Sequence, residues 1–238
     1  MANDLPAGDA TGVEEQQSPA RNSGGLPTGL TEDAALALLH NPELSAEALS
    51  SFSKDPIVAK SRKVTLRLIA HSRTPRHVSV PLLRRMFIFD LVQVTRTPVI
   101  AADVKRAAEE QILLRLESLP AGQKVTLARK ASGRIAAELL RDSDQRVISP
   151  AIENAQLTEA LVVQALMKRG APAVAFSLVS RHPKWSQRRE VQIALLRSEK
   201  TPLDRAKQLA RNFHEKFLRG ILPHGRKEVL LKEARKDP

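Results

Sequence analysis

The chain has 238 residues and contains no cysteine. Disulfides and thiolate metal sites are therefore excluded, and a reducing compartment is permitted. Tyrosine is also absent, and phenylalanine together with the single tryptophan gives an aromatic content of 3%. A nucleic-acid partner would consequently find few rings on which to stack its bases, and stacking would depend on Phe or Arg side chains.

Long hydrophobic runs are also absent from the sequence. A membrane-spanning helix needs about 18 or more apolar residues in succession, and no such run occurs. The first thirty residues are acidic and lack the apolar segment of a secretory signal. We therefore expect a cytoplasmic protein with no membrane span.

Motifs for metals, cofactors and catalysis are missing as well. There is no nucleotide-binding glycine loop, no Ser-His-Asp or Cys-His order and no calcium-loop ligand series. No two of the six histidines stand at the i, i+3 or i, i+4 spacing that places two ligands on one helix face. The sequence therefore predicts no metal, no cofactor and no enzymatic activity.

A short phrase recurs wherever a helical pattern restarts. Each copy follows an apolar segment and ends in Ser, Thr or Pro, residues that cap or open helices. The copies are Asn41-Pro-Glu-Leu-Ser45, His71-Ser-Arg-Thr-Pro75, Asn154-Ala-Gln-Leu-Thr158, His182-Pro-Lys-Trp-Ser186 and Ser198-Glu-Lys-Thr-Pro202. Because helix pairs bury their apolar faces by stacking on neighbouring pairs, the repetition predicts an all-α helical solenoid.

Apolar periodicity predicts about twelve helices. The clearest stripe has spacings of 3, 4, 3 and 4, as one helix face requires, and consists of Leu203, Ala206, Ala210, Phe213 and Phe217. The expected helices span about residues 31–40, 45–54, 56–70, 76–95, 99–117, 122–141, 144–153, 158–169, 171–180, 186–197, 202–219 and 224–236.

Two longer segments carry a family resemblance. They are Asp55-Pro-Ile-Val-Ala-Lys-Ser-Arg-Lys-Val-Thr-Leu-Arg-Leu-Ile-Ala-His71 and its echo Asp142-Ser-Asp-Gln-Arg-Val-Ile-Ser-Pro-Ala-Ile-Glu-Asn154. These segments resemble the leucine-rich-repeat-variant and HEAT-like helical repeats of bacterial proteins, in which an acidic-Pro turn, a basic-Val pair and an Asn-Pro-x-Leu-Thr turn mark each unit. The resemblance covers most of residues 31–210. It implies a right-handed α-α superhelix of the HEAT-like kind, whose concave face serves mostly as a binding scaffold.

Charge is distributed unevenly along the chain. Residues 1–60 hold nine acidic and three basic side chains, whereas residues 61–238 hold seventeen acidic and thirty-five basic ones. We expect residues 1–30 to form a disordered acidic tail and residues 31–238 to form one domain. Such a basic body favours an anionic partner, either an acidic protein or a nucleic acid.

Basic side chains gather on individual predicted helix faces. Lys60, Lys63 and Arg67 fall within about 60° of one another on the helix expected over residues 56–70. The other candidates for polyanion binding are Arg188, Arg189, Lys207 and Arg211. A series of such faces along a solenoid would follow a phosphate backbone. The alternative is that these side chains form solvated outer faces.

Three further residues have two interpretations each. Asp90 lies in the most apolar stretch and is the sole catalytic candidate, but we favour an ion pair with Arg84, Arg85 or Arg96. Trp185 precedes an expected helix cap, where a staple against the next turn competes with stacking on a ligand. Gly133 either weakens its predicted helix or permits a close helix approach.

Together these patterns predict a non-enzymatic scaffold that binds a macromolecule. The alternative is a DNA-acting HEAT-like protein of the alkylpurine glycosylase or lesion-binding type. Proteins of that type place an acidic residue beside aromatic and Arg side chains, and in this chain Asp90 would take that role.

Overall fold

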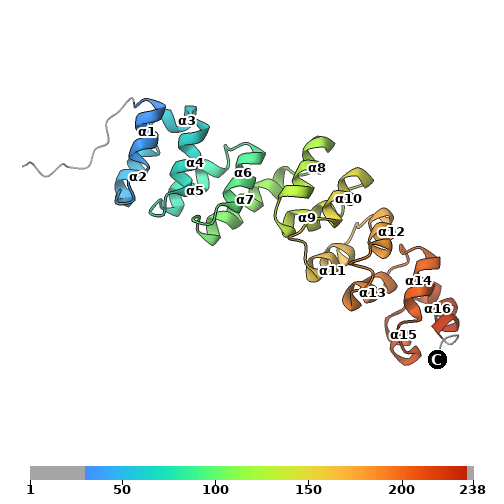
Figure 1. Ribbon diagram of the computed structural model, residues 1–238. Helices are drawn as coiled ribbons and strands as arrows, with labels where there is room; N and C mark the ends of the chain where they lie inside the picture. Colours follow the sequence, from blue (N-terminus) through green and yellow to red (C-terminus); the bar gives the residue numbers. More distant parts are fainter. Residues whose placement is uncertain (1–29, 235–238) are drawn as a thin grey trace, which may run out of the picture.

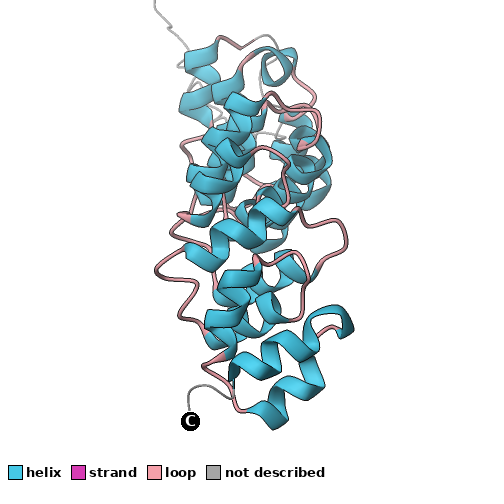
Figure 2. Ribbon diagram, turned by 90° about the vertical axis from the view of Figure 1, so that its right-hand side faces the viewer, coloured by secondary structure: helices cyan, strands magenta, loops and turns pink. Residues whose placement is uncertain are grey.

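The computed structural model describes residues 30–234, and all regular elements in this range are helical (Figures 1 and 2). The predicted tail lies outside the described residues, apart from Leu30. The elements are α1 (Glu32–Leu38), α2 (Ala46–Phe52), α3 (Pro56–Lys60), α4 (Arg62–Ala70), α5 (Arg76–Leu83), α6 (Ile88–Arg96), α7 (Ala102–Arg115), α8 (Ala121–Lys130), α9 (Gly133–Leu139), α10 (Gln145–Ile152), α11 (Glu159–Met167), α12 (Ala173–Arg181), α13 (Arg189–Leu196), α14 (Leu203–Ala210), α15 (Glu215–Ile221), the 3-10 turn η1 (His224–Arg226) and α16 (Lys227–Ala234). None of these helices is long and apolar enough to cross a bilayer.

The prediction of twelve helices is wrong because four of the long expected helices are each divided in two. Ser61 ends α3 and caps α4, since its hydroxyl accepts a hydrogen bond from the Val64 N–H at 3.2 Å. Pro81, which has no N–H, lies near the end of α5 and precedes the break before α6. Gly133 begins α9, and the ring of His214 caps α15. The stripe from Leu203 to Phe217 is therefore shared by two helices.

The recurring phrase is confirmed as a turn. In every copy the side chain of the first residue accepts a hydrogen bond from the N–H two residues later, at distances between 2.8 and 3.3 Å. These first residues are Asn41, His71, Asn154, His182 and Ser198. The last residue is the N-cap of the next helix in four copies. The exception is Ser186, because α13 begins three residues later than predicted.

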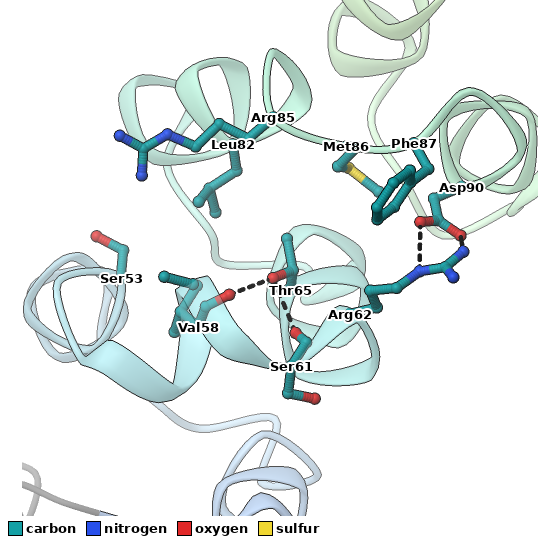
Figure 3. Close-up of a pocket in the computed structure, with 11 residues that line it drawn as sticks. Ser53, Val58, Ser61, Arg62, Thr65, Leu82, Arg85, Met86, Phe87 and Asp90 are labelled. Carbon is teal, nitrogen blue, oxygen red and sulfur yellow. Dashed lines mark hydrogen bonds and ion pairs between the residues drawn. The ribbon is translucent and has the colours of Figure 1, made fainter.

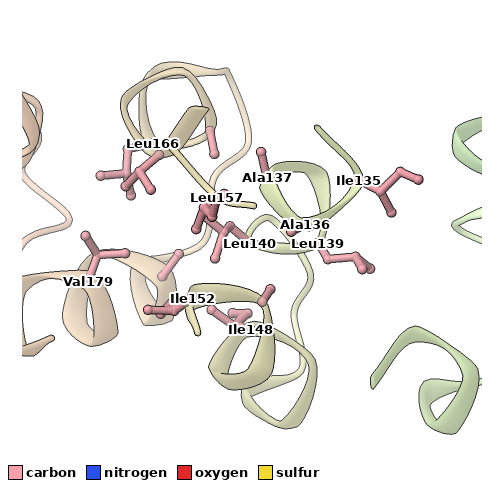
Figure 4. Packing of buried hydrophobic residues seen from close by; sticks show 14 of the residues in the cluster. Ile135, Ala136, Ala137, Leu139, Leu140, Ile148, Ile152, Leu157, Leu166 and Val179 are labelled. Atoms are coloured by element: carbon pink, nitrogen blue, oxygen red, sulfur yellow. The ribbon is translucent and has the colours of Figure 1, made fainter. Parts of the chain in front are cut away.

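The helices form two layers along one direction (Figure 1). The first layer contains α1, α4, α6, α8, α10, α12 and α14, and the second contains α2, α5, α7, α9, α11, α13 and α15. Apart from the short α3, which packs on α4, the helices from α1 to α15 alternate between the layers, and α16 packs on α14. The buried apolar residues form two clusters, a small one between Ala35 and Val78 and a large one between Ile69 and Leu230, and Leu82 packs against both. Part of the large cluster is drawn in Figure 4.

Polar contacts tie several turns to the equivalent turn of the neighbouring helix pair. His71 Nε2 lies 3.0 Å from the Asn41 carbonyl oxygen, and Arg73 pairs with Glu43 at 2.9 Å. Both contacts connect residues that are 30 positions apart. We call the border formed by the turns from the first to the second layer edge 1 (residues 39–45, 71–75, 97–101, 131–132, 153–158, 182–188 and 211–214).

The opposite border has its own set of contacts. Arg141 Nη2 donates to the Arg169 carbonyl at 2.9 Å, and Arg115 Nη1 donates to the Met86 carbonyl at 2.7 Å. We call this border, formed by the turns from the second to the first layer, edge 2 (residues 53–55, 84–87, 116–120, 140–144, 168–172 and 197–202). Because equivalent turns lie together, the first-layer helices all end along edge 1.

Two residues fix the packing at the centre of the array. Trp185 is 1% exposed, and its Nε1 donates to the Ile152 carbonyl at 3.0 Å. Its burial is that of a structural residue, but the staple position predicted for it is wrong, because the N-cap of α13 is Arg188 and not Ser186. At Gly133 an added Cβ would lie 2.1 Å from the Gln156 carbonyl oxygen, which confirms a close approach at this glycine.

Candidate anion-binding edge and the Arg62–Asp90 pocket

The three N-terminal basic candidates do not share one helix face. Lys60 is the last residue of α3, whereas Lys63 and Arg67 belong to α4, so the break at Ser61 removes the geometry predicted for Lys60. Lys63 lies near edge 2 and pairs with Glu32 at 3.3 Å. Arg67 lies in the last turn of α4, toward edge 1, and is exposed.

The four C-terminal candidates lie at the other end of the array (Figure 1). Arg188 is the N-cap of α13, and the guanidinium of Arg189 lies 5.5 Å from the centroid of the Phe213 ring. Lys207 lies in the last turn of α14, and Arg211 forms an ion pair with Glu233. The structure therefore separates the seven predicted residues into two groups rather than one patch.

A different set of cations follows edge 1. Five first-layer helices carry basic residues in their last turn, namely α4, α6, α8, α12 and α14. Five second-layer helices carry none there, namely α2, α5, α9, α11 and α13. We call the exposed basic residues in these last turns the edge-1 cations. They are Arg67, Arg96, Arg129, Lys130 and Arg181. None of them has a side-chain partner among residues 30–234.

Most of the strong ion pairs lie at edge 2 instead. Lys124 pairs with Asp142 at 2.9 Å, with side chains only 17% and 13% exposed. Lys168 pairs with Glu138 at 3.0 Å, and Arg141 bonds to the same carboxylate. Local acids thus hold Lys124, Lys168 and Arg141 at edge 2, although Lys54, Arg84, Arg169 and Arg197 have no ionic partner there within residues 30–234. The edge-1 cations are likewise available to a partner.

Asp90 lies in a pocket of about 160 Å³ between α4 and the start of α6 (Figure 3). Its two carboxylate oxygens accept hydrogen bonds from Arg62, at 3.0 Å from Nε and 2.7 Å from Nη2. These bonds and the negative charge of Asp90 raise the pKa of Arg62 above its usual value. The Arg62 guanidinium also lies 4.7 Å from the centroid of the Phe87 ring.

The ion pair predicted for Asp90 is confirmed, but the three predicted partners are wrong. Arg62 comes from the preceding helix pair, 28 residues earlier in the chain. The repeat itself could have indicated this partner, because contacts between neighbouring helix pairs connect residues about 30 positions apart at several places in the array. The carboxylate is 10% exposed at the side chain, and both of its oxygens are occupied by one guanidinium.

Searches of protein-family models, curated proteins and solved structures found no match to this chain. Within residues 30–234, no three His, Asp or Glu side chains are placed to hold a metal ion together. Function is therefore inferred from the geometry of edge 1, of the Arg62–Asp90 pocket and of the grooves between helices.

Proposed function

We propose that the protein is a non-enzymatic scaffold that binds an anionic macromolecule along edge 1. In this proposal the two layers continue as a right-handed, HEAT-like superhelix, and the ligand is a nucleic-acid backbone or an acidic protein. The observation that carries the proposal is the row of edge-1 cations, which have no acidic partner in the described part of the chain.

A purely structural explanation accounts for less of this pattern. Cations in the last turn of a helix interact favourably with the helix dipole, by about 0.3–1 kcal/mol each. That benefit applies equally to both layers. Most second-layer helices nevertheless lack a basic last turn, and Arg219, one of their two exceptions, pairs with Glu215 within its own helix. Second-layer helices carry cations at the C-cap instead, as at Arg84, Lys168 and Arg197, and Lys168 is paired with Glu138. The row of unpaired cations within the last turns of stacked first-layer helices is the feature that favours a ligand at edge 1.

The spacing of the edge-1 cations suits an extended ligand. Packed helices lie about 8–10 Å apart, so the helices from α4 to α12 extend edge 1 over roughly 35 Å. A polyanion bound along this length would neutralise several charges at once and release counterions. A small ion would contact only one or two of the cations.

Fluorescence anisotropy with a short DNA duplex and with polyglutamate, at several salt concentrations, tests the proposal. We expect at least one of these polyanions to bind at about 0.15 M salt, with log K falling steeply as log salt rises. If neither binds under these conditions, or if the slope is near zero, the proposed function is wrong.

One observation favours the alternative of DNA-acting chemistry. Asp90, Phe87 and two arginines, Arg62 and Arg85, line the same pocket, which combines acidic, aromatic and basic side chains (Figure 3). Asp90 would first have to leave Arg62 before it could act on a substrate. Release of an alkylated base from DNA by the wild-type protein, and its loss in Asp90→Asn, would replace the scaffold proposal with this one.

A further inference from the structure

A groove separates α6 from α8 within the first layer. Its volume is about 690 Å³, and it is lined by Phe89, Val92, Gln93, Arg96, Thr97, Pro98, Thr126, Leu127 and Lys130. On either side the first-layer helices make closer contacts, α6 with α4 and α8 with α10. The groove is thus a gap in the stacking of one layer, where apolar side chains that would otherwise face a neighbouring helix remain accessible.

The floor of the groove is apolar. Val92 and Leu127 belong to the large core cluster, and Phe89 remains 42% exposed beside them. An exposed Phe next to buried aliphatic side chains is typical of a site that anchors a partner's apolar side chain. A phosphate backbone would gain nothing from these surfaces.

The rim of the groove is positive. Arg96 and Lys130 lie at the C-terminal ends of the two helices, are exposed, and have no ionic partner in the described range. The single acidic side chain on α6 and α8 is Asp90, which Arg62 already holds. Lys105 adds a third cation, since its Nζ lies 3.3 Å from the carbonyl oxygen of Pro98 in the groove wall.

We propose that the α6–α8 groove binds a short acidic peptide segment of a partner protein. Two apolar side chains of the peptide pack against Phe89, Val92 and Leu127, while flanking carboxylates lie between Arg96 and Lys130. The argument is one of complementarity, because an apolar floor and a cationic rim fit a segment that is apolar at its centre and acidic at its ends. This inference rests on the proposed function, since the groove opens at edge 1, and it identifies the partner as a protein.

The length of the groove sets the size of the segment. Helices of nine and ten residues, like α6 and α8, are about 14–15 Å long. Two apolar side chains one helical turn apart, about 5.4 Å along the axis, fit within this length together with a carboxylate at each end. We therefore expect recognition of a short motif rather than of a whole domain surface.

A labelled synthetic peptide tests this proposal. The probe has two leucines four positions apart, with Glu at most other positions. Its first control replaces both leucines by serine, and its second replaces every Glu by Lys. With the full chain, we expect the leucine–glutamate peptide to bind at least about 10-fold more tightly than either control.

Variants of the protein locate the binding site. Phe89→Ala should weaken binding of the leucine–glutamate peptide by about 10-fold or more. Leu114→Ala, which shortens a residue that is 77% exposed on α7, should leave this affinity unchanged. The pair Arg96→Glu and Lys130→Glu should weaken it similarly. The matched pair Arg169→Glu and Arg197→Glu makes the same change in net charge at edge 2, away from the groove, and should have a much smaller effect. Circular dichroism of each variant checks that it is folded.

Three results would overturn the inference. The first is equal binding of the serine control, and the second is an unchanged affinity in Phe89→Ala. The third is self-association of the wild type that Phe89→Ala abolishes, because a second copy of this chain would then occupy the groove. If the duplex or polyglutamate still binds along edge 1 in these cases, the proposed function remains and only the groove assignment fails. If no anionic probe binds, both are wrong.

Discussion

The substitution Gly133→Ala tests the packing of the array at a single atom. The new Cβ would lie 2.1 Å from the Gln156 carbonyl oxygen, 2.8 Å from its carbon and 3.0 Å from Leu161 Cδ1. Carbon atoms at such positions almost never approach closer than 3.0 Å, so the turn must move by about 0.9 Å or more. Ala is favoured over Gly within a helix by at most about 1 kcal/mol, whereas overpacking typically costs about 1–3 kcal/mol.

The clash should prevail because the turn cannot move freely. Asn154 Oδ1 accepts a hydrogen bond from the Gln156 N–H at 2.8 Å. The Nδ2 of the same side chain donates to the carbonyls of Ala128 and Ala131, at 2.7 and 3.0 Å. Displacement of Gln156 would therefore strain three hydrogen bonds, two of which are buried. We expect Gly133→Ala to lower the free energy of unfolding by about 2 kcal/mol.

Urea denaturation followed by circular dichroism measures this change, and Gly220→Ala is the matched control. Gly220 lies in α15 and has no atom within 4 Å of an added Cβ, so alanine there should stabilise by about 0.4–1 kcal/mol. The double variant Gly133→Ala and Asn154→Ala should lose less free energy of unfolding than the sum of the two single variants, because the Asn154 side chain no longer holds the turn in place. If Gly133→Ala is as stable as Gly220→Ala, the close approach at Gln156 is wrong.

Three further predictions concern the other fixed points of the fold. Trp185→Ala should destabilise by about 3–5 kcal/mol while polyanion binding by the folded protein persists, and lost binding at an unchanged melting temperature would make Trp185 a ligand contact. Asp90→Asn should destabilise by about 1–2 kcal/mol, because Arg62 loses a charged partner, without any change in polyanion affinity. The hydrogen bonds from Arg146 lower the pKa of Asp144 below its ordinary value of 3.8, so this carboxylate stabilises the fold above that pH and loses its effect as the pH falls through the lowered pKa. Melting temperatures of the wild type and of Asp144→Asn should consequently converge at the lowest pH, and a difference that is constant with pH would contradict the assignment.

The turns were predictable from the sequence because their chemistry is local. Asn41, His71 and Asn154 accept hydrogen bonds from N–H groups only two residues away, so a five-residue phrase contains the whole interaction. The breaks at Ser61 and before Glu215 were missed although they are also capped locally. In both cases the apolar periodicity continues across the break, which conceals the cap.

Edge 1 could not be predicted because it depends on the layer to which each helix belongs. The expected helices over residues 76–95 and 122–141 each merge a second-layer helix with a first-layer one, and this obscures the alternation between layers. The partner of Asp90 was missed for a related reason. Arg62 becomes its neighbour only when α4 and α6 stack in the same layer, which no local pattern around Asp90 indicates.

The most direct test of the anion-binding edge compares two variants with the same net charge. The first replaces Arg67, Arg96, Arg129 and Arg181 at edge 1 by Gln. The second replaces Lys54, Arg84, Arg169 and Arg197 by Gln. These four residues lie at or beside edge 2, are also exposed and lack an ionic partner in residues 30–234. Each variant is titrated with the polyanion that the wild type binds, duplex or polyglutamate, over a range of salt concentrations. For a duplex in full contact, we expect the edge-1 variant to flatten the slope of log K against log salt by roughly 3.6, and the edge-2 variant to retain the wild-type slope. Equal losses in the two variants would show that only the total charge matters, and would contradict a binding site at edge 1.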